Sequence, residues 1–257
     1  MRAVTPRPSV WFASAVLGLG CAASVAAQPE PAKVLLQSAD SLQIAAFWYA
    51  NSGKGAPVAV LLHDPGQTHH AWRTLVTPLY RSGFQILALD LRGHGESKEL
   101  TPEIYERMRQ HETQPYYDMI RDIDAAVRWL GAEQKTPAAR IALVGGGFSA
   151  NLAIEAVARN RSLGAAVALS PGKTYFQFPL VDWGRKYGNK PLYIVVPKQL
   201  LGEGSSEIAQ IMAHNPGFEM KVYPRTDIAG VQMLGVTPDL EYLITRWLCK
   251  VFGLKAS

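Results

Sequence analysis

Cysteine is scarce in this chain, with 2 residues in 257. Cys21 falls in an N-terminal segment that we expect to be removed on export, which leaves Cys249 alone and excludes an intramolecular disulfide. Residues 238–252 repeat apolar side chains every three or four positions, which predicts a helix with Thr237 as its N-cap. We therefore expect Cys249 to be a buried thiol on this helix, not a reactive one.

Dense runs of basic residues are also missing. The chain has 26 Lys and Arg residues against 21 Asp and Glu residues, a formal net charge of +5. Removal of residues 1–27 takes away two arginines and leaves a mildly basic chain. Without a Lys- or Arg-rich stretch, nucleic acid is a poor candidate partner. The sequence shows no internal repeat that would indicate a solenoid.

The N-terminal segment has the organisation of a secretory signal peptide. Arg2 and Arg7 precede an uncharged stretch over 8–29, and the small residues Val25 and Ala27 stand at the −3 and −1 positions of a cleavage site. We expect cleavage after Ala27, export to the periplasm or the cell exterior, and a mature chain over 28–257 that forms one domain with no stable membrane span. An uncleaved anchor and a lipid attached to Cys21 stay open as alternatives.

The remaining chain alternates apolar strands with helical stretches. Two strands are expected over 33–37 and 42–50, followed by strands that begin near residues 57, 84, 140, 165, 191 and 218. Strands that alternate with helices indicate a mostly parallel sheet, here of eight strands, with helices on both faces. Only residues 172–190 separate the sixth and seventh of these strands, so no large cap domain fits there.

Three segments carry a resemblance to a known family. The strand over 56–62 runs into His63-Asp-Pro-Gly66, the strand over 84–91 runs into Arg92-Gly-His-Gly-Glu-Ser97, and Ile141–Val144 runs into three glycines before a helix. These segments resemble the oxyanion loop, the D-x-R-G-H-G-x-S turn and the nucleophile elbow of α/β-hydrolases, including dienelactone hydrolases and carboxylesterases. The resemblance covers residues from about 33 to the end, and it implies the α/β-hydrolase fold and no metal or organic cofactor.

The expected nucleophile position of that elbow is a glycine. Aligning Gly145 with the first glycine of G-x-S-x-G places Gly147 at the nucleophile. The other register makes Ser149 the nucleophile, but it puts Asn151 where a small residue is needed and pushes two glycines into the strand, where glycine is unfavourable. Ser149 is kept as the fallback nucleophile.

Three further positions depart from the catalytic pattern that the resemblance implies. Glu203 is the nearest carboxylate after the seventh strand, and Ala229 stands where the family has its histidine. Pro65 occupies the usual oxyanion-donor position but has no N–H, which leaves Phe148 as a donor. With His63 and Asp64, these residues are expected to form vestigial triad and oxyanion positions.

Two functional hypotheses follow. The first is an exported pseudo-hydrolase that binds a small apolar ligand or a protein, such as an active related hydrolase. Phe176, Phe178 and Trp183 would then roof its pocket, although a short helix that buries them in the core is the competing interpretation. The second is a weak or unconventional serine esterase that uses Ser149.

Other polar residues are interpreted as structural. In the helix expected over 116–130, Asp122 and Asp124 are assigned to a solvated face, with Asp124 paired to Arg128 four residues on. His69 is assigned to the surface at a helix start, not to a metal site.

Overall fold

A central sheet organises the protein, which a computed structural model describes over residues 1, 29–53, 55–224 and 227–256. Its eight strands lie in the order β1-β2-β4-β3-β5-β6-β7-β8. Strands β3 to β8 pair in parallel, whereas β2 pairs antiparallel with β1 on one side and with β4 on the other. The expected signal peptide and Cys21 lie outside the described residues.

The strands are β1 (Ala32–Gln37), β2 (Gln43–Tyr49), β3 (Val58–Leu62), β4 (Gln85–Leu89), β5 (Ile141–Gly146), β6 (Ala165–Leu169), β7 (Leu192–Pro197) and β8 (Phe218–Tyr223). The helices are α1 (Arg73–Arg81), α2 (Ser97–Leu100), α3 (Pro102–Arg109), α4 (Gln114–Asp118), α5 (Ile120–Ala132), α6 (Gly147–Arg159), α7 (Leu180–Lys186), α8 (Ser206–Ile211) and α9 (Leu240–Phe252). Each strand that the sequence predicts is present.

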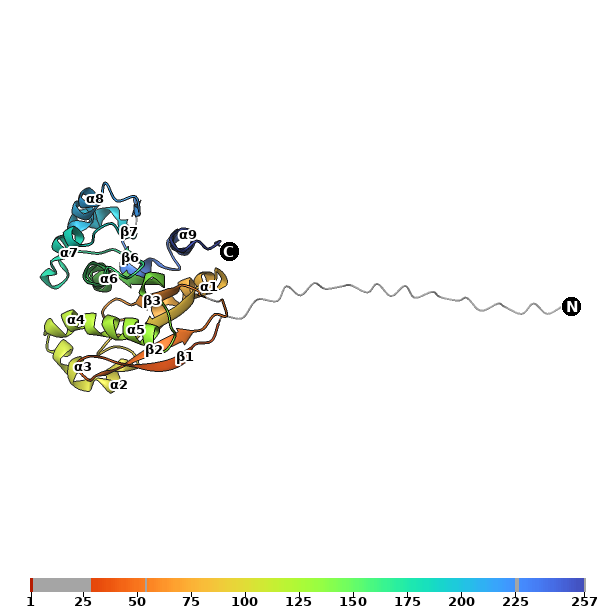
Figure 1. Cartoon of the computed structure of the whole chain (residues 1–257), viewed down its shortest axis with the longest axis horizontal. Coiled ribbons are helices and arrows are strands. Elements are labelled where there is room, and N and C mark those ends of the chain that lie inside the picture. The colour runs from red at the N-terminus through yellow and green to blue at the C-terminus, as the bar shows by residue number, and fades with distance from the viewer. Residues whose placement is uncertain (2–28, 54, 225–226, 257) are drawn as a thin grey trace.

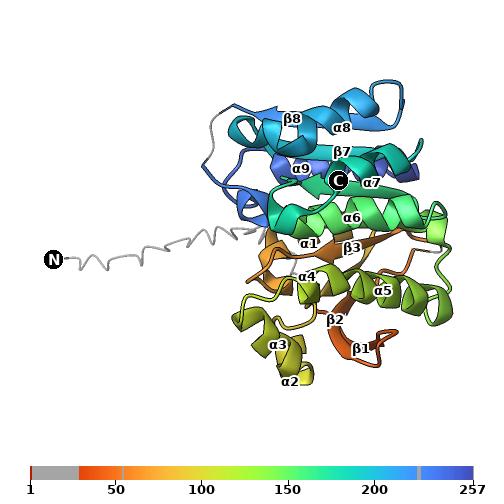
Figure 2. The same ribbon diagram turned by 90° about the vertical axis from the view of Figure 1, so that its left-hand side faces the viewer.

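The sheet is covered on both faces, which explains why its central strands are continuous apolar runs. Alternate residues of β3 divide between two cores: Val58, Val60 and Leu62 face the core under α5 to α8, and Ala59 and Leu61 face the core under α1 and α9. Figure 1 shows the sheet between these helices, and Figure 2 shows α5 and α6 crossing one face together. The predicted mostly parallel sheet with helices on both faces is confirmed.

The connection from β6 to β7 is short, as expected. It holds a single 3₁₀ turn (Tyr175–Gln177) and α7, so no large cap covers the carboxyl ends of the strands. No helix within the described residues is long and apolar enough to cross a bilayer.

The turn after β4 contains a buried ion-pair network, and the prediction that Asp122 lies on a solvated face is wrong. Asp122 is fully buried, and its carboxylate accepts hydrogen bonds from the guanidinium of Arg92 at 2.6 and 3.0 Å. Arg92 also donates to Asp40 at 2.7 Å. Asp122 therefore belongs to the core, and only this long-range partner makes its burial possible.

Three local expectations are also corrected. Asp124 pairs with Arg159, not with Arg128. His69 is buried, with its ring stacked on Phe47 and its Nδ1 2.9 Å from Asp90 Oδ1. The last helix begins at Leu240, because Asp239 adopts a left-handed φ of 59° and replaces Thr237 as the N-cap residue. Cys249 is buried on this helix.

Candidate functional site

A sharp turn joins β5 to α6 at the centre of the sheet. Gly147 is the first residue of α6 and has a φ of 50°, a conformation that side chains disfavour. Gly145 precedes it where the helix approaches closely, since a Cβ there would lie 2.8 Å from the backbone nitrogen of Ala150. The tip of the turn is therefore Gly147, and Ser149 lies within the first turn of the helix.

The space beside Gly147 is filled by the carboxylate of Asp64. A Cβ at Gly147 would lie 2.7 Å from Asp64 Cγ and would overlap Oδ1. The carboxylate accepts a hydrogen bond from the backbone N–H of Phe148 and another, at 3.1 Å, from that of Val231. Asp64 thus brings the loop after β3 into the position where a side chain at the tip of the turn would begin.

Burial raises the pKa of Asp64 to about 6, and the two backbone donors oppose this shift without cancelling it. The N–H of Phe148 is the group that an acyl-transfer enzyme with this turn would direct at the developing oxyanion. In this structure it is already bonded to an internal carboxylate.

Ser149 is held away from the tip of the turn. Its side chain is fully buried, and its hydroxyl donates a hydrogen bond of 2.6 Å to the carbonyl oxygen of His63. The imidazole of His63 has both nitrogens engaged: Nε2 accepts from the N–H of Leu91 at 3.0 Å, and Nδ1 donates to the carbonyl of Asp64 at 2.8 Å. Burial, with His94 nearby, lowers the pKa of His63 to about 3, so its ring is neutral and structural.

Glu203 and Ala229 lie in loops that reach the same end of the sheet. Glu203 follows β7, and its Oε2 is buried with no hydrogen-bond partner among the described residues. Burial raises the pKa of Tyr175, and the charges of Asp64 and Glu203 add to that increase, so this phenol lies near both carboxylates. Ala229 precedes a 3₁₀ turn (Gly230–Met233) in an extended conformation.

The residues expected as a pocket roof separate into different environments. Phe178 is 2% exposed and packs edge-on against Phe148, with ring centroids 5.6 Å apart. Phe176 is half-buried and stacks on Tyr116 at 4.3 Å. Trp183 lies on α7 with the ammonium of Lys186 4.6 Å from its ring centroid.

Two cavities lie on either side of the loop that follows β3. The larger, about 590 Å³, is bordered by Gly66 to Thr74 and by the segment from Val231 to Val236. The smaller, about 320 Å³, lies between the same loop, the Gly93–Gly95 turn and helices α2 to α4. No group of three His, Cys, Asp or Glu residues within the described ranges could hold a metal ion.

The order of the strands, the sharp turn after β5 and the loops around it can now be compared with known proteins. The sequence pattern of the α/β hydrolase family matches residues 59–248. The chain belongs to this family. The match includes the Asp64 loop, the turn at Gly147 and the segment around Ala229. No curated protein sequence matches the chain.

Solved structures share the fold at low sequence identity. An esterase from Pyrococcus furiosus has a TM-score of 0.70 and 21% identity over 86% of this chain and 92% of its own. A dienelactone hydrolase from Anabaena variabilis has a TM-score of 0.66 and 15% identity over 89% of this chain and 100% of its own chain. An α/β hydrolase from Penicillium has a TM-score of 0.67 and 13% identity over 87% and 99%. These likenesses concern the fold.

Proposed function

We propose that this protein is an exported, catalytically inactive α/β hydrolase that binds a small ligand or a partner protein. The observation that carries the proposal is the Asp64 carboxylate, which fills the space beside Gly147 and engages the N–H of Phe148. A nucleophile has no room at the tip of the turn, and a substrate oxyanion would have to displace a carboxylate to reach its donor.

The residues around Asp64 support the same function. A triad needs a base within hydrogen-bond reach of the nucleophile. Ala229 offers none, and His63 uses both ring nitrogens in backbone hydrogen bonds. The alternative, an esterase that uses Ser149, would require this buried hydroxyl to leave the carbonyl of His63.

The proposal is tested by labelling the purified mature chain with a fluorophosphonate probe and by measuring hydrolysis of short-chain esters. We expect no label and no turnover above buffer. Ser149→Ala and Ser170→Ala serve as a matched pair, because both hydroxyls are buried at this end of the sheet. Labelling that disappears in Ser149→Ala but persists in Ser170→Ala would establish the esterase instead.

A partner protein is tested separately. Affinity capture from the cells that export the chain should recover a related active hydrolase if the binding role is to hold or regulate one. Gly131→Ala changes an open helix position. This variant should fold and capture the same hydrolase as the wild type, so it serves as the matched control. Repeated failure to recover any hydrolase would restrict the proposal to small ligands.

A further inference from the structure

The two charged side chains that line the smaller cavity, of about 320 Å³, are both cationic. They belong to Lys98 and Arg109, and none of the lining residues is acidic. The ammonium of Lys98 lies 3.9 Å from the ring centroid of Tyr105. Among the described residues, Arg109 pairs only with Glu106, in an exposed contact of 3.2 Å, and such surface pairs stabilise weakly. Both cations can therefore turn to an anion in the cavity at little cost.

One wall of the cavity is formed by aromatic and apolar side chains. Tyr105, Met108 and Tyr116 border it from α3 and α4. Tyr116 is half-buried, and its ring stacks on Phe176, which fixes its orientation. A volume near 300 Å³ is at the lower limit of small-molecule sites, so it suits a ligand of one ring.

Gln67 lines the cavity from the loop after β3. Its Oε1 atom is shielded from solvent and accepts no hydrogen bond from the described residues, so the side chain must turn to present this atom to a ligand. A buried acceptor without a partner is unfavourable, so a ligand that donates a hydrogen bond there gains what the free protein lacks. Gln67 also lies in the loop that follows Asp64, which places this cavity beside the proposed site.

We infer that this cavity binds a small aromatic carboxylate that carries a hydroxyl group. The carboxylate lies toward Lys98 and Arg109, the ring lies against Tyr105 and Tyr116, and the hydroxyl donates to Gln67. This inference rests on the proposed binding role and names its ligand class. Labelling by the fluorophosphonate probe would overturn the proposed function without affecting this site, and a failed titration would overturn the site alone.

The test is a calorimetric titration of the mature chain with benzoate, the three hydroxybenzoate isomers, benzyl alcohol and benzylamine. We expect at least one hydroxybenzoate to bind with a dissociation constant of about 1 mM or lower, more tightly than benzoate, with no binding of benzylamine. In NMR spectra of the same titration, a shift of the amide signal of Gly95, and not of that of Gly235, would place the ligand in the smaller cavity. Binding of benzylamine as tightly as benzoate, or no binding at all, would overturn the inference.

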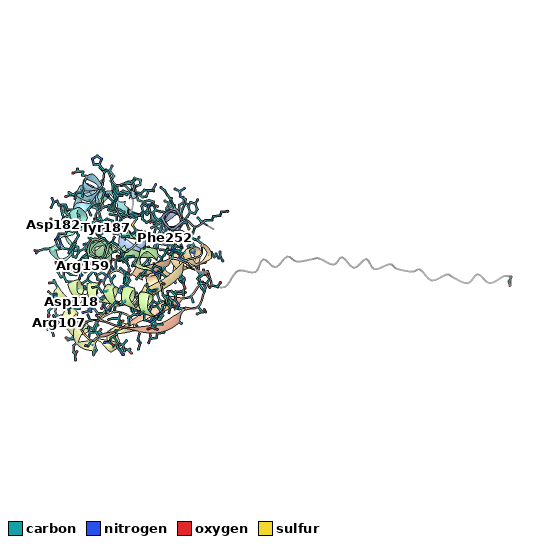
Figure 3. The ribbon with its side chains drawn as sticks, in the orientation of Figure 1. Arg107, Asp118, Arg159, Asp182, Tyr187 and Phe252 are labelled. Carbon is teal, nitrogen blue, oxygen red and sulfur yellow. The ribbon has the colours of Figure 1, made fainter. Side chains whose placement is uncertain are left out.

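Three variants assign the contacts. Lys98→Met and Arg109→Met should each weaken hydroxybenzoate about threefold, and raised salt should weaken it similarly. Gln67→Met should abolish the preference for hydroxybenzoate over benzoate while benzoate affinity changes less than twofold. The matched control is Arg107→Met, which removes a cation from the same helix as Arg109. Arg107 pairs with Glu112 at 2.8 Å, and Figure 3 shows it at the periphery. Equal losses in all four variants would overturn the assignment.

Discussion

Asp64 and Gly147 fit each other at the turn between β5 and α6. The carboxylate lies where a Cβ at residue 147 would be, and Gly230 on its other side leaves the same space open, since a Cβ there would lie 3.0 Å from Asp64 Cγ. One side chain thus accounts for two glycines in segments far apart in sequence. At the level of single residues, the site is built around a carboxylate.

Gly147→Ala should destabilise the protein by about 2–4 kcal/mol, because it adds a Cβ at positive φ and forces Asp64 to move. Urea unfolding measures this loss. Gly131→Ala, on an open helix position, should be neutral or stabilising by up to about 1 kcal/mol. In an Asp64→Gly background the cost of Gly147→Ala should fall by at least about 1 kcal/mol. An unchanged cost would mean that the two residues do not compete for space.

Asp64 should also make stability depend on pH. Its pKa is about 6 in the folded chain and about 3.9 in an unfolded one, so the folded state holds more protons between these values. Its contribution is fully present below about pH 4 and is lost as the pH rises to about 6, a change of about 2–3 kcal/mol. Asp64→Asn lacks this titration. The unfolding free energy of the variant minus that of the wild type, measured with urea, should therefore increase from pH 4.5 to pH 7. A decrease in this value would show that the backbone donors lower the pKa of Asp64 more than burial raises it.

The helices and strands were predictable because their signals are local. Apolar runs of five or six residues, separated by turns and amphipathic stretches, describe strands buried on both faces between helices. The glycines at 145–147 marked the turn after β5, since only this register places glycine at a positive φ and at the close approach to α6. The family resemblance added the α/β-hydrolase fold.

The ion-pair network was not predictable, because it joins three elements that are distant in sequence. Arg92 follows β4, Asp40 lies in the hairpin between β1 and β2, and Asp122 lies on α5. On a helix, the sequence pattern predicts that an aspartate next to an apolar stripe is exposed to solvent. Only the fold shows that a guanidinium covers it. The same holds for Asp64, whose side-chain direction depends on how the loop after β3 packs on Gly147.

At the scale of elements, this network should hold the antiparallel edge of the sheet to α5. Arg92→Met should destabilise the protein by about 3–5 kcal/mol, because it leaves the buried carboxylate of Asp122 without its partner. Asp122→Asn should cost less, because Arg92 keeps its ion pair with Asp40. Arg121→Met is the matched control: its side chain is 47% exposed and its guanidinium contacts Asp40 at 3.1 Å, so its loss should cost less than about 1 kcal/mol. Unfolding in urea measures all three. Equal effects would mean that burial adds nothing to the pair.

At the scale of the whole molecule, the sheet directs its loops to one end. The carboxyl ends of the parallel strands carry Asp64, Gly147 and Glu203, and both cavities border the first of these loops. Ligands bind open α/β sheets at this end. Under the proposed function, the fold keeps this face for binding without catalysis, since family membership and catalytic function are separate questions.

The cellular compartment of the whole molecule decides which ligands can reach the carboxyl end of the sheet. We propose that the chain is exported and cleaved after Ala27, given the basic start and the small residues at Val25 and Ala27. Mass spectrometry of the chain recovered from the periplasm or the medium should then show an N-terminus at Gln28. Ala27→Arg should block cleavage and leave the precursor in the membrane fraction, whereas Ala22→Ser, outside the cleavage site, should be processed normally. A mature mass that retains lipid on Cys21, or an uncleaved chain in both variants, would replace free export with attachment to a membrane and confine the ligands to those near its surface.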